Sequence, residues 1–165
     1  ALYNAALRAG LTIVESKPHT IPADYVDGGL DVTISSSGPD LKISNPHDAA
    51  VMFTVSYSNN QLMVAVLGPQ LPYILDFYSE KAGMTAEPET IYHYNAATTP
   101  DGQPIAPGKS IIYAAPRAGQ TFRVYKTTKD LSGNILKTEL FSEVSYAAIQ
   151  GHVYVNGPDP SESTG

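Results

Sequence analysis

After Gly10 the sequence is a series of short segments in which apolar and polar residues alternate, each interrupted by proline, glycine or asparagine. A period of two is typical of strands, because successive side chains of a strand point to opposite faces. We expect strands over 11–15, 30–35, 41–44, 51–57, 61–67, 90–94, 110–114, 121–129, 135–147 and 152–155, and a strand or extended linker over 73–78. The sequence therefore predicts a mainly β protein.

One helix is expected, at the start of the chain. Leu2, Ala6 and Leu7 fall on one helical stripe, and Gly10 suits a left-handed stop. Ala1 has no side chain that could cap the first turn, so we expect the natural start of the helix, and any export signal, to lie upstream.

A cluster of prolines near Pro72 predicts a division into two domains. The first, over 1–78, is expected to be α+β, with the short helix packed on a small antiparallel sheet. The second, over 79–157, is expected to be a small antiparallel β domain. Residues 158–165 are polar and predict a flexible tail. Tight turns at 58–60 and 132–134 predict one hairpin in each domain.

Composition excludes several classes of function. The net charge of −6 without a basic cluster argues against a nucleic-acid partner. The chain contains no cysteine, so disulfides, thiolate metal sites and a thiol nucleophile are excluded within these residues. No apolar run approaches the roughly 20 residues of a membrane helix, and no cofactor is expected. Eleven tyrosines, against four phenylalanines and no tryptophan, favour an interaction protein.

Four segments closely resemble the VanW-like family, in its order and spacing. They are Leu-Tyr-Asn-Ala-Ala-Leu-Arg-Ala-Gly-Leu at 2–11, Lys-Pro-His-Thr at 17–20, Gly-Leu-Asp-Val-Thr-Ile at 29–34 and Pro-Asp-Leu-Lys-Ile-Ser-Asn at 39–45. The resemblance covers residues 2–68 and implies an exported protein of the Gram-positive cell envelope, extracellular or on the cell surface and associated by name with a vancomycin-resistance cluster. Family sequences carry a Cys-Gln pair just before the first segment, and the present sequence begins after that point.

The second half resembles the glycine-marked small β domain that accompanies VanW-like units on surface proteins. The resemblance rests on Pro-Gly at 107–108, Ala-Gly-Gln-Thr-Phe at 118–122, Ser-Gly-Asn at 132–134 and Val-Tyr-Val-Asn-Gly at 153–157. It implies a module that holds cell-wall sugar polymers or spaces neighbouring domains.

His19 and Asp31 are the candidates for chemistry, although no complete catalytic set is present. With a cysteine upstream of the helix they would resemble a Cys/His/acid nucleophilic arrangement. The alternative is structural: His19 lies in a proline-flanked turn, and Asp31 bonds loop amides after Gly28 and Gly29.

Metal sites are not expected. Asp24, Asp27 and Asp31 flank a glycine pair and are weak calcium candidates, but their spacing suits a solvated acidic loop better. The remaining histidines lie on separate predicted elements without metal-ligand spacing: His47, His93 and His152.

Tyrosines recur on the predicted strands and are the candidate binding residues. Flat amphipathic rings stack well on sugars and prolines, although such tyrosines also serve as core and cross-strand pairs. The candidates are Tyr92, Tyr94, Tyr113, Tyr125, Tyr146 and Tyr154.

Three functions remain open. The first is a binding or structural module that contacts cell-wall polysaccharide, a peptide or another surface protein. The second is the remainder of a cysteine-dependent envelope transferase or peptidase-like domain, whose nucleophile lies upstream of Ala1. The third is self-assembly into a homo-oligomer through open sheet edges.

Overall fold

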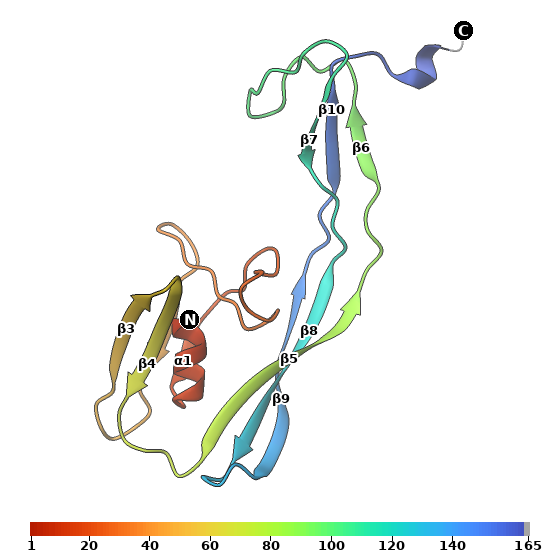
Figure 1. The fold of residues 1–165 in the computed structure, drawn as a ribbon. Coiled ribbons are helices and arrows are strands. Elements are labelled where there is room, and N and C mark those ends of the chain that lie inside the picture. The colour runs from red at the N-terminus through yellow and green to blue at the C-terminus, as the bar shows by residue number, and fades with distance from the viewer. Residues whose placement is uncertain (164–165) are drawn as a thin grey trace. The chain divides into compact units, whose positions relative to one another are not determined.

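The structure is a computed structural model, and it describes residues 1–163. Figure 1 shows a mainly β chain that begins with one short α-helix, as predicted. In chain order the elements are α1 (Leu2–Arg8), β1 (Thr12–Glu15), β2 (Lys42–Ser44), β3 (Met52–Ser58), β4 (Gln61–Leu67), β5 (Ile74–Met84), β6 (Thr90–His93), β7 (Ser110–Ala114), β8 (Gln120–Lys129), β9 (Ile135–Tyr146), β10 (Gly151–Val155) and a 3-10 helix (Pro160–Ser163).

The chain divides into two compact units, and their segments alternate along the sequence. Unit 1 consists of residues 1–82 and 121–146, and unit 2 consists of residues 83–120 and 147–165. The expected domains over 1–78 and 79–157 stay a prediction, as does the flexible tail over 158–165, whose last two residues lie outside the described part. None of the helices within residues 1–163 is long and apolar enough to span a membrane.

Helix α1 ends where the sequence predicts. Gly10 has a φ of +69°, a conformation that glycine adopts without steric cost. Its amide donates to the Leu7 carbonyl, and the next amide, of Leu11, donates to the Ala6 carbonyl at 3.0 Å. These bonds satisfy carbonyls at the open end of the helix and turn the chain into strand β1.

The hydrophobic core of unit 1 gathers side chains from distant parts of the sequence. Leu7 of α1, Leu30, Phe77 of β5 and Val124 of β8 form one buried cluster. Phe77 also meets the ring of Phe141, on β9, edge to face at 5.1 Å between ring centres. Burial of these side chains joins the helix and the loop at residue 30 to the three-stranded sheet β5-β8-β9.

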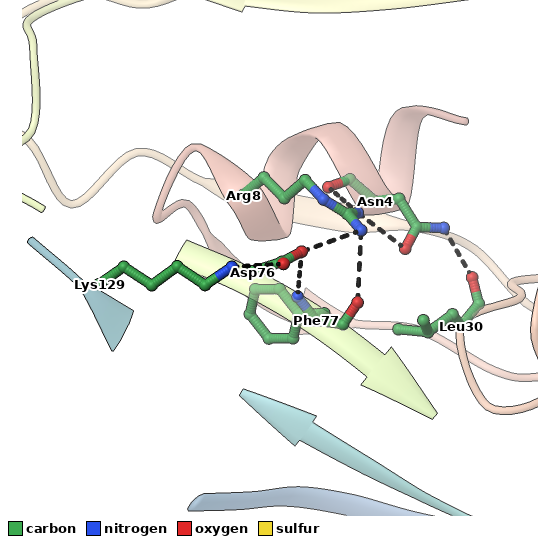
Figure 2. A network of polar contacts seen from close by, with 6 residues as sticks. All are labelled: Asn4, Arg8, Leu30, Asp76, Phe77 and Lys129. Atoms are coloured by element: carbon green, nitrogen blue, oxygen red, sulfur yellow. Dashed lines mark hydrogen bonds and ion pairs between the residues drawn. The ribbon is translucent and has the colours of Figure 1, made fainter. Parts of the chain in front are cut away.

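A network of polar contacts connects helix α1 with the loop at residue 30 and with strands β5 and β8 (Figure 2). The Asp76 carboxylate accepts a 3.1 Å bond from Lys129 Nζ and lies 3.7 Å from Arg8 Nη2. Asn4 donates through Nδ2 to the Leu30 carbonyl at 2.8 Å. Burial raises the pKa of the Asp76 carboxyl, but the bonds from Lys129 and the Phe77 amide outweigh it, so the pKa lies below its ordinary value. These groups are half-exposed, and their ion pairs contribute little to stability.

The hairpin of β3 and β4 is the one expected at residues 58–60. Asn59 and Asn60 both have positive φ, 50° and 58°, which matches a two-residue type I′ turn. The strands pair in regular antiparallel register from Met52 opposite Leu67 to Ser58 opposite Gln61. The other strands of unit 1 form the pair β1-β2 and the sheet β5-β8-β9.

The strand expected over 30–35 is wrong, because this segment is a loop. Leu30 and Asp31 are both buried although they are consecutive. The backbone makes loop contacts instead of a ladder: the Leu30 amide donates to the Asp27 carbonyl, and the Thr33 amide to the Lys17 carbonyl. Only the start of the segment is buried, next to the glycine pair, whereas Ile34 is 67% exposed.

Unit 2 is built on the three-stranded sheet β6-β10-β7. Strand β10 lies in the middle and pairs parallel with β6 and antiparallel with β7, with a register shift between His152 and Val153. The β10–β6 pair is thus parallel in a unit that we expected to be antiparallel. Among the described residues of this unit, the buried ones are Thr99, Ile105, Gly119, Gly151 and Val153.

Candidate functional site

Asp31 is the centre of a buried polar cluster in unit 1. Its side chain is fully shielded from solvent, although the loop that carries it lies at the surface. One carboxylate oxygen, Oδ2, accepts bonds of 2.8 Å from both the backbone amide and the Nδ1 of His19. The other oxygen, Oδ1, accepts a bond from the Tyr146 hydroxyl. A buried carboxylate is stable only with such partners.

These contacts determine which nitrogen of His19 carries the proton. Burial raises the pKa of the Asp31 carboxyl, but the hydrogen bonds from Tyr146 and His19 lower it further, so the pKa lies below its ordinary value. Asp31 is therefore ionised at neutral pH and can only accept hydrogen bonds. Nδ1 of His19 must be the donor, which leaves Nε2 of the neutral ring with a free lone pair.

Tyr146 reaches this cluster from the end of strand β9. Its oxygen accepts a 2.7 Å bond from the Gly29 amide, and its hydroxyl donates to Asp31. Burial, and then the bond to Asp31, raise the pKa of Tyr146 well above its ordinary value. Tyr146 is therefore a neutral hydrogen-bond donor at any physiological pH.

Two hollows in unit 1 border Asp31. One, of about 250 Å³, is lined by residues that include Tyr3, Ser16 and Ser142. The other, of about 190 Å³, extends to Ala1 and is lined mostly by apolar groups. The His19 side chain is one-third exposed, so its ring lies at the surface while its partner carboxylate is buried. The arrangement can accept and hold a proton at Nε2 of His19.

The three aspartates considered for calcium are not gathered around one point. Residues 1–163 contain no group of three or more His, Cys, Asp or Glu side chains placed to hold a metal ion. Asp31 is engaged by His19 and Tyr146, as described above. The loop with Asp24 and Asp27 supplies a backbone carbonyl to the amide of Leu30.

The structure brings together two histidines that the sequence pattern treats as separate. His93 on β6 and His152 on β10 lie 3.0 Å apart between Nε2 and Nδ1, with stacked rings. His93 also stacks on the Tyr154 ring at 4.3 Å between centres. His47 lies in unit 1, where its Nε2 is 3.0 Å from the Ala9 carbonyl at the end of α1.

The candidate tyrosines fall into two groups by unit. In unit 2, Tyr92 and Tyr94 stack on each other with ring centres 6.1 Å apart and planes 15° from parallel. Tyr113 meets Tyr154 edge to face at 5.6 Å. In unit 1, Tyr125 stacks on Tyr78 at 5.2 Å, and Tyr146 is buried at Asp31. The six tyrosines therefore do not form a single strip.

The register of unit 2 separates its tyrosines onto two faces of one sheet. Residues paired across a ladder point to the same face. Tyr92 pairs with Val153, and His93 with Tyr154. Tyr92 therefore lies on one face, where Tyr94, just after the strand, stacks on it, while Tyr154 lies on the opposite face with His93 and, by its ring contact, Tyr113.

The sequence analysis did not place Tyr146 in the Asp31 cluster or Tyr3 at its border. The sequence analysis lists Tyr146 among the candidate binding or core tyrosines, because nothing in its spacing links it to a residue 115 positions earlier. Tyr3 borders the cluster; burial, and then the negative charge of Asp31, raise its pKa. The only signal for Tyr3 was its place on the predicted helix, next to the stripe of Leu2 and Ala6.

Comparison with known proteins identifies the first part of the chain. Residues 1–67 match the family model "VanW like protein". YoaR of Bacillus subtilis (strain 168) is 32% identical over 65 residues, which are 39% of this chain and 22% of YoaR. The chain thus spans about a fifth of the length of that relative.

Two solved structures of G5 domains share low similarity with the chain. The G5 structure of HP0197 is 18% identical, with a TM-score of 0.24, over 50% of this chain and 96% of its own. The G5 domain of an IgA1 protease is 15% identical, with a TM-score of 0.26, over 53% of this chain and 93% of its own. Such TM-scores do not establish a common fold. The likeness therefore rests on the sequence match, and we refer to residues 1–67, which match the family model, as the VanW-like segment.

Proposed function

We propose that the protein is a binding module of the bacterial cell envelope that contacts a wall polymer or a surface peptide through tyrosines of unit 2. The VanW-like segment supports a location in the cell envelope, because the resemblance to this family implies an exported envelope protein. The observation that carries the binding role is the stacked pair of Tyr92, on the edge strand β6, and Tyr94, just after the end of that strand.

This pair has the properties of a recognition surface. Tyr92 is 54% exposed, and Tyr94 is partly exposed. Rings that are nearly parallel offer a flat apolar area, with hydroxyls at its edge for hydrogen bonds. Val153, paired with Tyr92, is buried, and its β-branched side chain supports the tyrosine from the middle strand. Sugar rings and prolines are flat enough to stack on such a surface.

The test is sedimentation of the purified protein with insoluble peptidoglycan that carries its wall polymers, and separately with peptidoglycan stripped of them. We expect the wild-type protein to sediment. Loss of one stacking ring costs roughly 1–2 kcal/mol, so Tyr92→Ala and Tyr94→Ala should each weaken binding about 5- to 30-fold. Tyr25→Ala removes a tyrosine of unit 1 that is 75% exposed, and it is the control. Equal binding by all three variants and the wild type would contradict the proposal.

A second candidate function, cysteine-dependent catalysis on envelope peptides, is favoured by the His19–Asp31 pair. A buried carboxylate that holds one ring nitrogen and leaves the other free is the base-and-orienter part of a nucleophilic site. The hollow beside Asp31 extends to Ala1, the end of the chain at which family sequences carry their cysteine. The nucleophile would come from that preceding segment of the natural protein.

The natural full-length protein is the material for this test. It is incubated with peptidoglycan stem peptides, and products are measured by mass spectrometry. We expect turnover that is blocked by a thiol-alkylating reagent and reduced at least 100-fold by His19→Ala, since a positioned base typically contributes that much. Absence of turnover, or turnover unchanged by His19→Ala, would rule out this candidate while leaving the binding role intact.

A further inference from the structure

We propose that Tyr146 is a positioning residue that fixes the Asp31 carboxylate against His19, so that the cluster begun by the VanW-like segment is completed by strand β9. The inference deepens the second candidate function and rests on it. It assigns a role to a residue far outside the matched range of 1–67.

The first observation is that each carboxylate oxygen has its own side-chain partner. Oδ2 faces His19, and Oδ1 faces Tyr146. A carboxylate bound on one side only can rotate about its terminal torsion, which is broad for aspartate. The Tyr146 hydroxyl removes that freedom from the opposite side, and the plane of the carboxylate is then set for the His19 ring.

The second observation is that Tyr146 is itself held in place. The Gly29 amide donates to its oxygen, which leaves the hydroxyl proton directed at Asp31. The Phe122 ring of β8 meets the Tyr146 ring edge to face at 5.8 Å. Phe122 also packs on the backbone of Gly28, where a Cβ atom would lie 2.6 Å from the ring. The loop that carries Gly28, Gly29 and Asp31 therefore packs closely against side chains of β8 and β9.

The chemical consequence concerns the neutral form of His19. Free histidine favours the proton on Nε2, whereas Asp31 requires it on Nδ1. Only the Nδ1–H form leaves Nε2 free to accept a proton from a nucleophile. If the Tyr146 hydroxyl holds the Asp31 carboxylate in place, it determines what fraction of neutral His19 carries its proton on Nδ1.

The experiment is ¹⁵N NMR of the histidine rings, recorded above the pH at which they become neutral. The groups that face His19 are Asp31 and the Tyr25 ring, which lies at a right angle to the His19 ring, and Tyr146 acts through Asp31. Resonances are assigned with His19→Gln. We expect the wild-type protein to show His19 protonated on Nδ1 alone. In Tyr146→Phe the signals should shift toward a mixture of the two forms, as they should in Asp31→Asn.

Tyr125→Phe is the matched control, because it removes a tyrosine hydroxyl from the partly exposed stack on Tyr78 and should leave the His19 signals unchanged. A Tyr146→Phe protein that is folded and keeps His19 purely in the Nδ1–H form would overturn the proposal. A readout on the wild type guards against a variant that fails to fold. The Tyr146 hydroxyl proton should exchange slowly and show a nuclear Overhauser effect to the Gly29 amide, and its absence would also overturn the proposal.

These readouts are independent of catalysis. If the full-length protein shows no turnover that depends on His19, the second candidate function fails, whereas the ¹⁵N shifts still report whether Tyr146 orients the pair. If turnover is present and the His19 tautomer is the same in Tyr146→Phe as in the wild type, the catalytic function stands and the positioning role fails.

Discussion

Gly29 is constrained twice, by its backbone and by its surroundings. Its φ of +83° is strained for any residue with a side chain, and a Cβ atom there would lie 2.8 Å from Cγ2 of Val124. Gly133 has a similar φ, +91°, with open space around it. The two glycines separate the cost of the conformation from the cost of the contact.

We predict that Gly29→Ala destabilises unit 1 more than Gly133→Ala does. Both substitutions carry a left-handed strain of about 1–2 kcal/mol. Gly29→Ala adds overpacking against Val124, about 1–3 kcal/mol more. The measurement is the free energy of unfolding in urea. Equal losses for both variants would show that the loop is free to move away from β8.

Tyr146 predicts a specific weakening of the fold in alkali. Its pKa is raised in the folded protein, so its contribution to stability is complete below the unfolded pKa of about 10 and is lost as pH rises through the folded value. We expect the free energy of unfolding to fall above about pH 10 more steeply in the wild type than in Tyr146→Phe. A smaller slope should remain in the variant, since Tyr3 is shifted in the same direction. Identical slopes would contradict the buried hydroxyl.

The sequence nominated two of the three residues in this cluster. His19 and Asp31 lie in two of the four segments that resemble the VanW-like family, and the structure places Nδ1 of His19 2.8 Å from Oδ2 of Asp31. The contact of Tyr146 with Asp31 could not be predicted, because a single tyrosine at the end of a strand has the same sequence pattern whether it faces a ligand or a buried carboxylate. Only the fold distinguishes the two.

Among the elements, strand β8 makes the contact that the core depends on. Val124 is completely buried, and it packs with Leu7, Leu30 and Phe77. Val124→Ala removes two methyl groups and leaves a cavity, so we predict a loss of about 2–4 kcal/mol in the free energy of unfolding. Val55→Ala, on the exposed strand β3, is the control and should cost less than about 0.5 kcal/mol. A small effect of Val124→Ala would mean that β8 does not belong to the core of unit 1.

Element prediction succeeded where local chemistry decides the outcome. Gly10 ends α1, and Asn59 and Asn60 form the turn of the β3–β4 hairpin, because each residue tolerates a positive φ that the geometry requires. It failed at residues 30–35, where the alternating pattern is that of a strand but the amides bond within a loop. Tertiary burial of Leu30 and Asp31 outweighs the local periodicity there.

At the scale of the whole molecule, the order of segments was not readable from the sequence. Residues 121–146 return to unit 1 after a separate unit has begun at residue 83. The prolines near Pro72 predict a division into two contiguous domains, because a local pattern gives no sign that a later segment returns to an earlier unit. The strands β5 and β8 show no sequence sign that they share one sheet, because strand pairing at this distance depends on packing that no local pattern encodes.

The central claim, recognition of an envelope ligand through tyrosine faces, is tested most directly by the salt dependence of binding to peptidoglycan. Between 0.01 M and 1 M salt the Debye length falls from about 30 Å to about 3 Å, which abolishes attraction between exposed charges but not aromatic stacking. With a net charge of −6 and stacked tyrosines at the sheet edge, the protein should keep its affinity within about threefold across that range, and Tyr92→Ala and Tyr94→Ala should weaken binding at every salt concentration. An affinity that falls strongly at high salt and is unchanged by both substitutions would contradict the account.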